Sequence, residues 1–312
     1  MKILITGGTG SFGQAFTELL LHESINGVSA DAIRIYSRDE FLQSQMAERF
    51  THAPKHLIRY MVGDVRDRDR LTRAMDGVDI VVHAAAMKQL STAEYNPQEA
   101  VNTNINGTVN VIESAVDADV AQVMLISTDK ACRPCNLYGA TKMVAERLFI
   151  AANTTYGSHR TRLSATRYGN VVDSRGGVAG IFASQRMRNK PLTITDPEAT
   201  RYILTLKQGA RFVLDRLNQL AGGKIYVPQL PAVTIGDLAE AIAPGHERVI
   251  IGMRRGEKTH EELISPDEAP YVWVYQGSNV HEINVYEINT YLNTRENSGV
   301  MRSDEAERLT VS

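Results

Sequence analysis

Residues 3–13 read Ile3-Leu4-Ile5-Thr6-Gly7-Gly8-Thr9-Gly10-Ser11-Phe12-Gly13, an apolar run followed by a glycine-rich turn. Three of the glycines have the spacing G-x-x-G-x-x-G. Glycine permits a tight turn and lets the backbone approach a pyrophosphate, which then lies at the N-terminus of the next helix. A strand, such a turn and a helix in that order are the context that a dinucleotide-binding turn requires. We therefore expect this turn to bind a dinucleotide through Gly7, Thr9, Gly10, Ser11, Phe12 and Gly13.

Apolar runs of strand length alternate with helix-like segments through the first half of the chain. The runs are rich in Ile and Val and cover residues 2–6, 32–36, 57–62, 78–84 and 121–127. Between the first two runs, Phe12, Phe16 and Leu19 recur at three- and four-residue spacing, which places them on one helix face. This alternation predicts an α/β fold of Rossmann type, with a doubly wound parallel sheet covered by helices on both faces.

The second half of the chain is less regular and predicts a smaller domain that holds the substrate. Glycines and prolines interrupt residues 169–200, after which residues 201–218 have a helical pattern and residues 223–227 a strand pattern. We expect a dinucleotide-binding domain in residues 1–168 with a return segment at about 201–230, and a substrate-binding domain in residues 169–200 and 231–312.

The composition is that of an ordinary globular protein. Of the 312 residues, 34 are Lys or Arg and 36 are Asp or Glu, which gives a formal charge of −2 and no reason to expect nucleic acid or an anionic membrane as a partner. No apolar run approaches the length of a membrane span, and the N-terminal segment lacks the features of a signal peptide. We expect a soluble cytoplasmic protein.

The two cysteines, Cys132 and Cys135, form a C-x-x-C pair. A zinc site would need two further strong ligands, and the chain has no second cysteine pair. A redox dithiol would be expected at a helix start in a different strand context. We interpret the pair as loop cysteines in a reducing compartment, and we predict no metal site.

The residues after the second predicted strand favour NADP over NAD. An NAD enzyme usually places a carboxylate here to bind the ribose 2′-hydroxyl, whereas Ser37 and Arg38 suit a 2′-phosphate. Asp39 argues against this preference unless it caps the following helix. After the third run, Asp64 and Val65 suit contact with the adenine.

The fourth run ends in His83-Ala84-Ala85-Ala86. The small side chains of Ala84 and Ala85 leave room for the nicotinamide half of the cofactor. Close packing of the sheet is the alternative reason for such a run.

Tyr138-Gly139-Ala140-Thr141-Lys142 opens a helix-like segment that extends from Leu137 to Ala152. Tyr138 and Lys142 are four residues apart and therefore lie on one helix face. A nearby ammonium and a cationic nicotinamide lower the pKa of a tyrosine and let it act as a base. Because the pair follows the fifth strand, we expect both residues to be catalytic and to contact the cofactor.

The fifth run leads into Thr128-Asp129-Lys130, at the end of a parallel strand where open α/β sheets bind their ligands. Thr128 can hold a substrate hydroxyl beside Tyr138. Simple oxidoreduction needs only a Thr, a Tyr and a Lys, so the additional Asp129 and Lys130 indicate a second acid–base step. The alternative is a solvated turn with a local ion pair.

These motifs stand in the order seen in the extended short-chain dehydrogenases/reductases. The matching segments are residues 6–13, 83–89, 93–97, 127–131, 138–142, 167–171 and 256–258. The set resembles the soluble UDP-N-acetylglucosamine 4,6-dehydratases, above all the inverting type that begins pseudaminic acid synthesis. The Thr-Asp-Lys triplet is the specific part of the resemblance, since the related deoxythymidine-diphosphoglucose dehydratases have Glu in its third position.

The resemblance implies a mechanism for these residues. Tyr138 takes the proton of the sugar O4 while hydride leaves C4 for NADP, Lys130 in its neutral form removes the C5 proton, and Asp129 protonates the departing O6 hydroxyl. Hydride then returns to C6, and reprotonation of C5 from the opposite face inverts that centre. A C5-retaining dehydratase and a UDP-sugar 4-epimerase are the alternatives. A non-catalytic NADP-binding protein would commonly lose the Tyr–Lys pair, which this chain keeps.

The resemblance also implies substrate contacts and assembly. The UDP-sugar would be bound by Lys88, Thr128, Asn170, Arg201, Arg254 and Glu257, although each charged residue could instead form a surface ion pair. Arg255 stands where relatives have a proline, which puts the sugar preference in doubt. Relatives form homo-oligomers, often hexamers.

Overall fold

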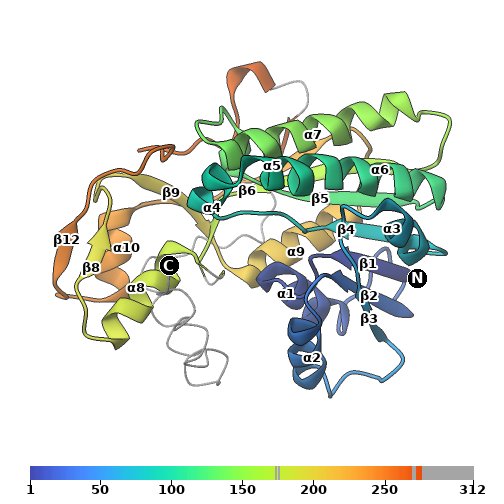
Figure 1. Ribbon diagram of the computed structural model, residues 1–312, viewed down its shortest axis with the longest axis horizontal. Helices are drawn as coiled ribbons and strands as arrows, with labels where there is room; N and C mark the ends of the chain where they lie inside the picture. The colour runs from blue at the N-terminus through green and yellow to red at the C-terminus, as the bar shows by residue number, and fades with distance from the viewer. Residues whose placement is uncertain (173, 175, 269–271, 276–312) are drawn as a thin grey trace. The chain divides into compact units, whose positions relative to one another are not determined.

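The computed structural model describes residues 1–172, 174, 176–268 and 272–275 (Figure 1). Within these residues the chain divides into two compact units. The first consists of Met1–Tyr168, Leu206–Gln229 and the described part of Glu262–Gly277, and the second of Gly169–Thr205 and Leu230–Glu261. Residues 276–312 of the expected substrate-binding domain lie outside the described part of the chain.

The first unit contains a parallel sheet that, among the described residues, has eight strands in the order β13-β10-β6-β5-β4-β1-β2-β3. Their bounds are β1 Lys2–Thr6, β2 Ala32–Ser37, β3 Ile58–Val62, β4 Ile80–His83, β5 Gln122–Thr128, β6 Arg162–Tyr168, β10 Ile225–Pro228 and β13 Val272–Tyr275. The predicted doubly wound parallel sheet is confirmed, and each of the first five strands ends within two residues of its predicted bounds.

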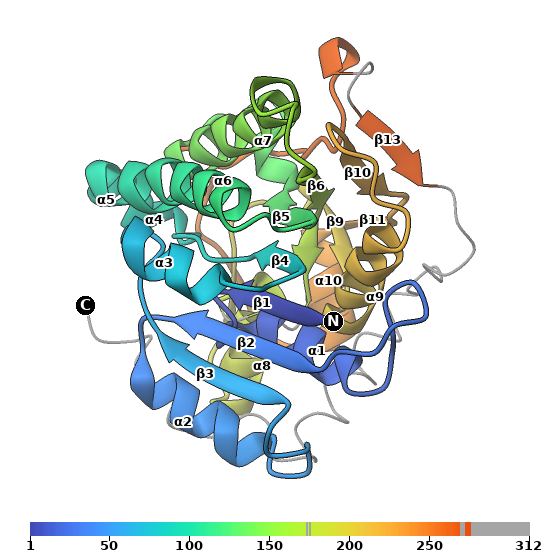
Figure 2. The ribbon, with the colours of Figure 1, turned by 90° about the vertical axis from the view of Figure 1, so that its right-hand side faces the viewer.

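Helices cover both faces of this sheet (Figure 2). One face is covered by α3 (Arg68–Met75), α6 (Gly107–Asp117) and α7 (Leu137–Thr155), the other by α1 (Ser11–Leu20), α2 (Glu40–Arg49) and α9 (Leu206–Leu217). Strand β1 is apolar at its centre because neither face meets water: Ile3, Leu4 and Ile5 are fully buried, whereas the edge strand β3 is partly exposed. The short helices α4 (Leu90–Tyr95) and α5 (Pro97–Val101) and a π-helix, Asn102–Asn106, precede α6.

The strand register brings the carboxyl ends of β1, β2, β4 and β5 to one edge of the sheet. Thr6 at the end of β1 lies opposite Tyr36 on one side and His83 on the other, and His83 lies opposite Leu125. The segments that follow these strands contain most of the predicted cofactor and catalytic residues. They therefore emerge from the same edge.

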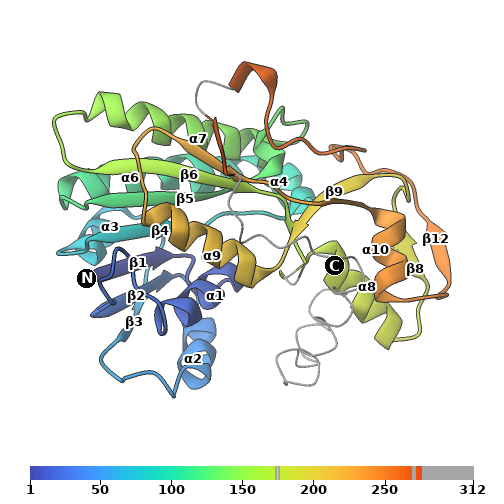
Figure 3. The same ribbon diagram turned by 180° about the vertical axis from the view of Figure 1, so that it is seen from behind.

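The second unit has its own small core (Figure 3). It contains a three-stranded sheet of β11, β9 and β7, a two-stranded sheet of β12 and β8, and two helices. Phe182, Leu192, Ile203 and Leu238 are among the buried residues of this core. The bounds are β7 Asn170–Val171, α8 Val178–Met187, β8 Leu192–Ile194, β9 Thr200–Leu204, β11 Ala232–Thr234, α10 Ile235–Ile242 and β12 Arg248–Ile250.

Two expectations for the second half of the chain are wrong. The helix expected from residue 201 begins at Leu206, because Thr200–Leu204 forms strand β9 between β7 and β11. Residues 231–312 do not all belong to the second unit. Residues 262–268 and β13 are part of the first, where β13 pairs with β10 and Glu268 forms an ion pair with Arg167.

Gly13→Ala should lower the free energy of unfolding by about 1–3 kcal/mol, because buried backbone that cannot move aside makes overpacking costly. A Cβ at Gly13 would lie 2.4 Å from the Gly8 carbonyl oxygen. Urea unfolding measures the change. Gly180→Ala in α8 is the control, since its Cβ would meet nothing within 4 Å and alanine in a helix is favoured by ~0.5–1 kcal/mol. Equal effects of the two substitutions would contradict the packing argument.

Candidate active site

The glycine turn after β1 leaves a surface without side chains at the start of α1. Gly7 has a φ of +65°, and a Cβ there would lie 2.8 Å from the backbone of Ala85. Gly10 is the N-cap of α1, and no side chain caps this helix end. A dipole-bearing helix N-terminus beside bare backbone fits the pyrophosphate of a dinucleotide. The predicted cofactor contacts of Gly7 and Ala85 therefore belong to two segments that pack closely together at this edge of the sheet.

The end of β2 presents a hydroxyl and a guanidinium. Ser37 is buried and its Oγ accepts a hydrogen bond of 3.0 Å from the Gln43 amide, so its own proton remains available for a ligand oxygen. Arg38 is 60% exposed. Asp39 accepts a hydrogen bond of 3.0 Å from the Leu42 N–H and caps α2, the role that reconciles it with NADP.

Asp64, expected beside the adenine, is held by a neighbouring arginine. Arg66 donates to its carboxylate at 2.7 and 2.9 Å, and Arg38 lies 3.9 Å away. Burial raises the pKa of Asp64, but the hydrogen bonds from Arg66 outweigh burial and the net pKa is lowered. The Asp64 carboxylate is thus ionised, and the Arg66 guanidinium compensates part of its negative charge. Val65 is buried against Gly107 of α6.

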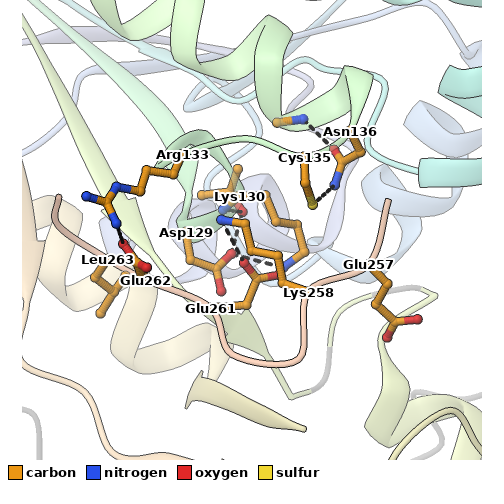
Figure 4. A network of polar contacts seen from close by, with 12 residues as sticks. Asp129, Lys130, Arg133, Cys135, Asn136, Glu257, Lys258, Glu261, Glu262 and Leu263 are labelled. Carbon is orange, nitrogen blue, oxygen red and sulfur yellow. Dashed lines mark hydrogen bonds and ion pairs between the residues drawn. The ribbon is translucent and has the colours of Figure 1, made fainter. Parts of the chain in front are cut away.

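Thr128, Asp129 and Lys130 form a compact polar group at the end of β5, and Figure 4 shows Asp129 next to Lys130. The Asp129 Oδ1 atom accepts hydrogen bonds of 2.9 Å from both the Thr128 hydroxyl and the Lys130 ammonium. Asp129 is fully buried, and its Oδ2 atom has no hydrogen-bond partner among the described residues. Lys130 is 19% exposed and does not face bulk water. The arrangement is a buried ion pair with one carboxylate oxygen left over.

Tyr138 and Lys142 lie one turn apart at the start of α7. Lys142 is buried, and its Nζ donates to the Ile126 carbonyl of β5 at 2.8 Å. Burial lowers the pKa of Lys142 to about 8, although Glu146 offsets part of the decrease. Burial raises the pKa of Tyr138 to about 12, against the opposing effects of the Lys130 charge and a hydrogen bond with Thr128. The cation that lowers the Tyr138 pKa is therefore Lys130 rather than Lys142, contrary to the sequence-based expectation.

The loop after β4 is fastened to α7 by a residue that the sequence did not single out. Asn104 in the π-helix hydrogen-bonds to the backbone of Met87 at 2.8 and 3.0 Å and donates to the Thr141 hydroxyl at 3.0 Å. π-Helical turns often mark functional positions. The only sequence signal is a buried amide in a segment of poor helix formers, which is too weak to identify it.

His83 is also fixed as a neutral ring. Its two nitrogens lie 2.7 Å from the Thr6 hydroxyl and 3.2 Å from the Thr108 hydroxyl. Burial lowers the pKa of His83 to about 3, and the charge of Lys142 acts in the same direction. The imidazole thus joins β1, β4 and α6 rather than serving as an acid or base.

The expected sugar-nucleotide residues fall in different parts of the chain. In the second unit, Arg201 is buried and donates to the Glu257 carboxylate at 3.0 Å, and the Arg254 N–H lies 3.4 Å from the same carboxylate. Asn170 is in β7 of the same unit. Lys88 is an exposed residue of the loop between β4 and α4 in the first unit.

Cys132 is buried and Cys135 is exposed. The described residues contain no cluster of three or more His, Cys, Asp or Glu side chains suited to a metal ion. Of the helices that the structure describes, none is both long and apolar enough to cross a membrane.

A parallel sheet that brings a glycine-rich turn and a tyrosine–lysine helix to the same edge is the architecture of the extended short-chain dehydrogenases/reductases, and this chain has it. Residues 3–280 match the family described as polysaccharide biosynthesis protein, and the chain belongs to that family.

Among relatives of known sequence, the chain is 48% identical to the UDP-N-acetylglucosamine 4,6-dehydratase (inverting) of Campylobacter jejuni, over 88% of this chain and 80% of that protein. It is 42% identical to the UDP-glucose 4-epimerase of Rickettsia felis, over 85% of this chain and 78% of that protein. The chain is therefore similar in sequence to proteins of more than one described activity.

Solved structures show the same fold. Pen from Bacillus thuringiensis superposes with a TM-score of 0.84 at 34% identity, covering 94% of this chain and 97% of that one. DesIV, a dTDP-glucose 4,6-dehydratase from Streptomyces venezuelae solved with NAD, superposes with a TM-score of 0.79 at 22% identity, covering 97% and 99%.

Asp129→Asn should lower the pKa of Tyr138 by about 1 unit, because it removes a nearby negative charge and leaves the Lys130 cation in place. The shift can be measured from the ¹³Cζ resonance of labelled tyrosine between pH 9 and 12, with Tyr138→Phe to assign the signal. Asp64→Asn is the control, since its carboxylate is not among the charges that act on Tyr138. A Tyr138 titration that is the same in both variants would refute the assignment.

Proposed function

We propose that this protein is a UDP-N-acetylglucosamine 4,6-dehydratase, a hydro-lyase of the C5-inverting type, with NADP as its cofactor. The observation that carries the proposal is the buried Asp129–Lys130 pair beside Tyr138, with a contact of 2.9 Å between Lys130 Nζ and Asp129 Oδ1. The identity of 48% to a curated enzyme of that name supports the substrate and the reaction.

The pair can supply both an acid and a base. Dehydration needs a neutral amine to take the C5 proton and a protonated carboxyl to deliver a proton to the leaving O6 hydroxyl. Moving a single proton from Lys130 to Asp129 across the contact produces both forms at once.

Tyr138 and Thr128 act at the sugar C4. Tyr138, ionised when the cation of the bound cofactor lowers its pKa, would take the O4 proton, and the hydroxyl of Thr128, which hydrogen-bonds to Tyr138, would hold the same substrate oxygen. The C4 ketone acidifies the C5 proton, Lys130 removes it, and Asp129 gives its proton to the C6 hydroxyl, which leaves as water. A solvent proton added to C5 from the opposite face would invert the centre, and in the overall balance it replaces the proton that Tyr138 takes from O4 and releases.

The cofactor, when bound, supplies the acceptor for the C4 hydride and returns it at C6. Its pyrophosphate would be held by the turn of Gly7, Thr9, Gly10, Ser11, Phe12 and Gly13. Ser37 and Arg38 would bind the 2′-phosphate of NADP, and Asp64 and Val65 would line the adenine. Ala84, Ala85, Tyr138 and Lys142 would contact the nicotinamide half.

Arginines would hold the charged part of the substrate. Arg201 and Arg254 present guanidinium groups suited to a pyrophosphate, and Glu257 orients the former. Lys88 and Asn170 would complete the sugar-nucleotide contacts. We further propose a cytoplasmic homo-oligomer, with a hexamer as one possible state, that acts at the start of pseudaminic acid synthesis.

A UDP-sugar 4-epimerase is the second candidate, because one relative at 42% identity has a 4-epimerase name. Epimerisation needs only the removal and return of the C4 hydride and the O4 proton. It gives no use for a buried acid–lysine pair, which is why dehydration is preferred. A C5-retaining dehydratase would use the same residues and differ in the face of reprotonation.

Incubation with UDP-N-acetylglucosamine in deuterated water tests the proposal. We expect a 4-keto-6-deoxy product that carries deuterium at C5, because the C5 proton is exchanged during dehydration. NMR of the product also gives the C5 configuration. Lys130→Ala should slow C5 exchange by about 10²–10⁴-fold, the usual contribution of a general base. A 4-epimer without deuterium, or exchange that survives in Lys130→Ala, would reject the proposal.

Arg38→Ala should weaken NADPH binding by about 10–100-fold while leaving NADH binding nearly unchanged, since a hydrogen bond to a charged group is worth roughly 1.5–3 kcal/mol. Fluorescence titration of cofactor-free protein measures both constants. Arg59→Ala, an exposed arginine on the neighbouring strand β3, is the matched control. Equal loss of the two cofactors would argue against a 2′-phosphate site at Arg38.

A further inference from the structure

A fully buried arginine joins three segments of the first unit. Arg167 in β6 donates through Nε and Nη2 to the Glu146 carboxylate at 3.0 and 2.5 Å. It donates through Nη1 and Nη2 to the Glu268 carboxylate at 2.8 and 2.9 Å, and through Nη1 to the Leu263 carbonyl at 2.9 Å. These five contacts use every N–H of the guanidinium.

The two carboxylates share one cation, so the buried group of three has a net negative charge. Burial raises the pKa of Glu268, but the bonds from Arg167 outweigh it and the net pKa falls to about 2, which keeps this carboxylate ionised. Arg147, which is half exposed, forms an ion pair of 3.5 Å with Glu268 and adds a second cation on that side of the group. Glu146 lies on the other side and shares the Arg167 guanidinium with Glu268.

Lys142 lies on that other side. Glu146 follows it by four residues on α7, the spacing at which helical side chains face each other, and both are buried. The direct partner of the Lys142 ammonium is a neutral one, the Ile126 carbonyl. Burying an ammonium with only a carbonyl is costly, so a nearby carboxylate has a large effect on its charge.

The charged groups around Lys142 can be named from each element packed against it. On its own helix these are Tyr138 and Glu146, and on β4 it faces His83, which is neutral at pH 7. On β5 it meets the backbone carbonyl, and in the turn after β5, which packs on α7, Asp129 and Lys130 pair with each other. Arg167 on β6 is engaged by its two carboxylates. Glu146 is the charge that raises the Lys142 pKa against the effect of burial.

We propose that Glu146 is a positioning residue of the active site, held by Arg167, which keeps the buried Lys142 side chain protonated at neutral pH. Its effect on turnover rests on the proposed acid–base function of this site. Its effect on the charge of Lys142 is independent of that proposed function.

The direction of the expected change in the Lys142 pKa follows from the groups around it. Burial lowers the pKa of Lys142 to about 8 with Glu146 in place, so the side chain is mostly an ammonium at pH 7. Removing the Glu146 charge leaves burial unopposed, and Lys142 should lose its proton at a pH lower by about 1 unit or more. At pH 7 about half or more of the Lys142 side chains would then be neutral.

The test is an NMR titration of ¹³Cε-labelled lysine in the full-length protein, with Lys142→Met to assign the signal. Glu146→Gln should move the Lys142 titration to lower pH. Glu268→Gln removes the other carboxylate from the same arginine, so it weakens the same network without removing the charge next to Lys142. Glu146→Asp keeps that charge and should restore the titration toward the wild-type position.

A shift in Glu146→Gln that is much smaller or absent in Glu268→Gln supports the inference. No shift, or equal shifts in the two variants, overturns it and leaves the network as structural only. If Glu146→Gln does not fold, the triple variant Glu146→Gln/Arg167→Met/Glu268→Gln removes the buried cation together with its partners, a replacement that proteins often tolerate. The same downward shift is then expected.

Turnover provides the second measurement. The alkaline limb of the kcat/KM profile for UDP-N-acetylglucosamine should move to lower pH in Glu146→Gln and stay in place in Glu268→Gln. An alkaline limb that moves equally in both variants would contradict the inference. If the protein proves not to be a dehydratase, the NMR titration still decides the function of Glu146, so the two failures are distinguishable.

Discussion

The parallel register of β1, β4 and β5 is the constraint on which the site depends. Thr6 lies opposite His83 and His83 opposite Leu125, so the three strands end at nearly the same level. Side chains alternate between the faces of a strand, and a slip of one residue would turn every following side chain to the other face. Gly7 reinforces the alignment, because a Cβ at this position would lie only 2.8 Å from the backbone of Ala85.

The buried charged groups of the first unit differ in how completely they are hydrogen-bonded and in how far their pKa values are shifted, because each one contacts different partners. Arg167 has a partner for every donor, which makes it a rigid junction between β6, α7 and residues 263–268. Lys142 has a carbonyl and a carboxylate one turn away, and its pKa is lowered to about 8. Of these three residues, only Asp129 has a buried side-chain atom without a hydrogen-bond partner in the described part of the chain. A buried carboxylate oxygen without a hydrogen-bond partner destabilises the folded protein. Such atoms are commonly found where a ligand or a proton will bind.

The features that the sequence predicted are the local ones. Continuous apolar runs identify strands covered on both faces, and the four-residue spacing of Tyr138 and Lys142 places them together on any helix. Residues 201–204 were predicted to be helical but form part of strand β9. The short strand was not predicted because a strongly helical pattern follows it directly. The Arg167–Glu268 pair joins residues 101 positions apart, and the return of β13 to the sheet is equally non-local. No periodicity or spacing could have predicted either contact.

The sequence also could not predict the electrostatic environment that sets the pKa of Tyr138. A lysine on the same helix face suggested a lowered pKa for Tyr138, yet desolvation dominates and the pKa rises to about 12. Lys130 opposes that rise from the neighbouring turn, and it does so only while it is charged. A proton that passes from Lys130 to Asp129 would remove the cation and the anion that act on Tyr138 together. The two effects have opposite signs, so the tyrosine would experience little net change while the pair beside it becomes an acid and a base. Asp129 and Lys130 are adjacent and their effects on the Tyr138 pKa cancel. The proton transfers at C5 and C6 can therefore take place beside the chemistry at C4 without changing the charge state of Tyr138.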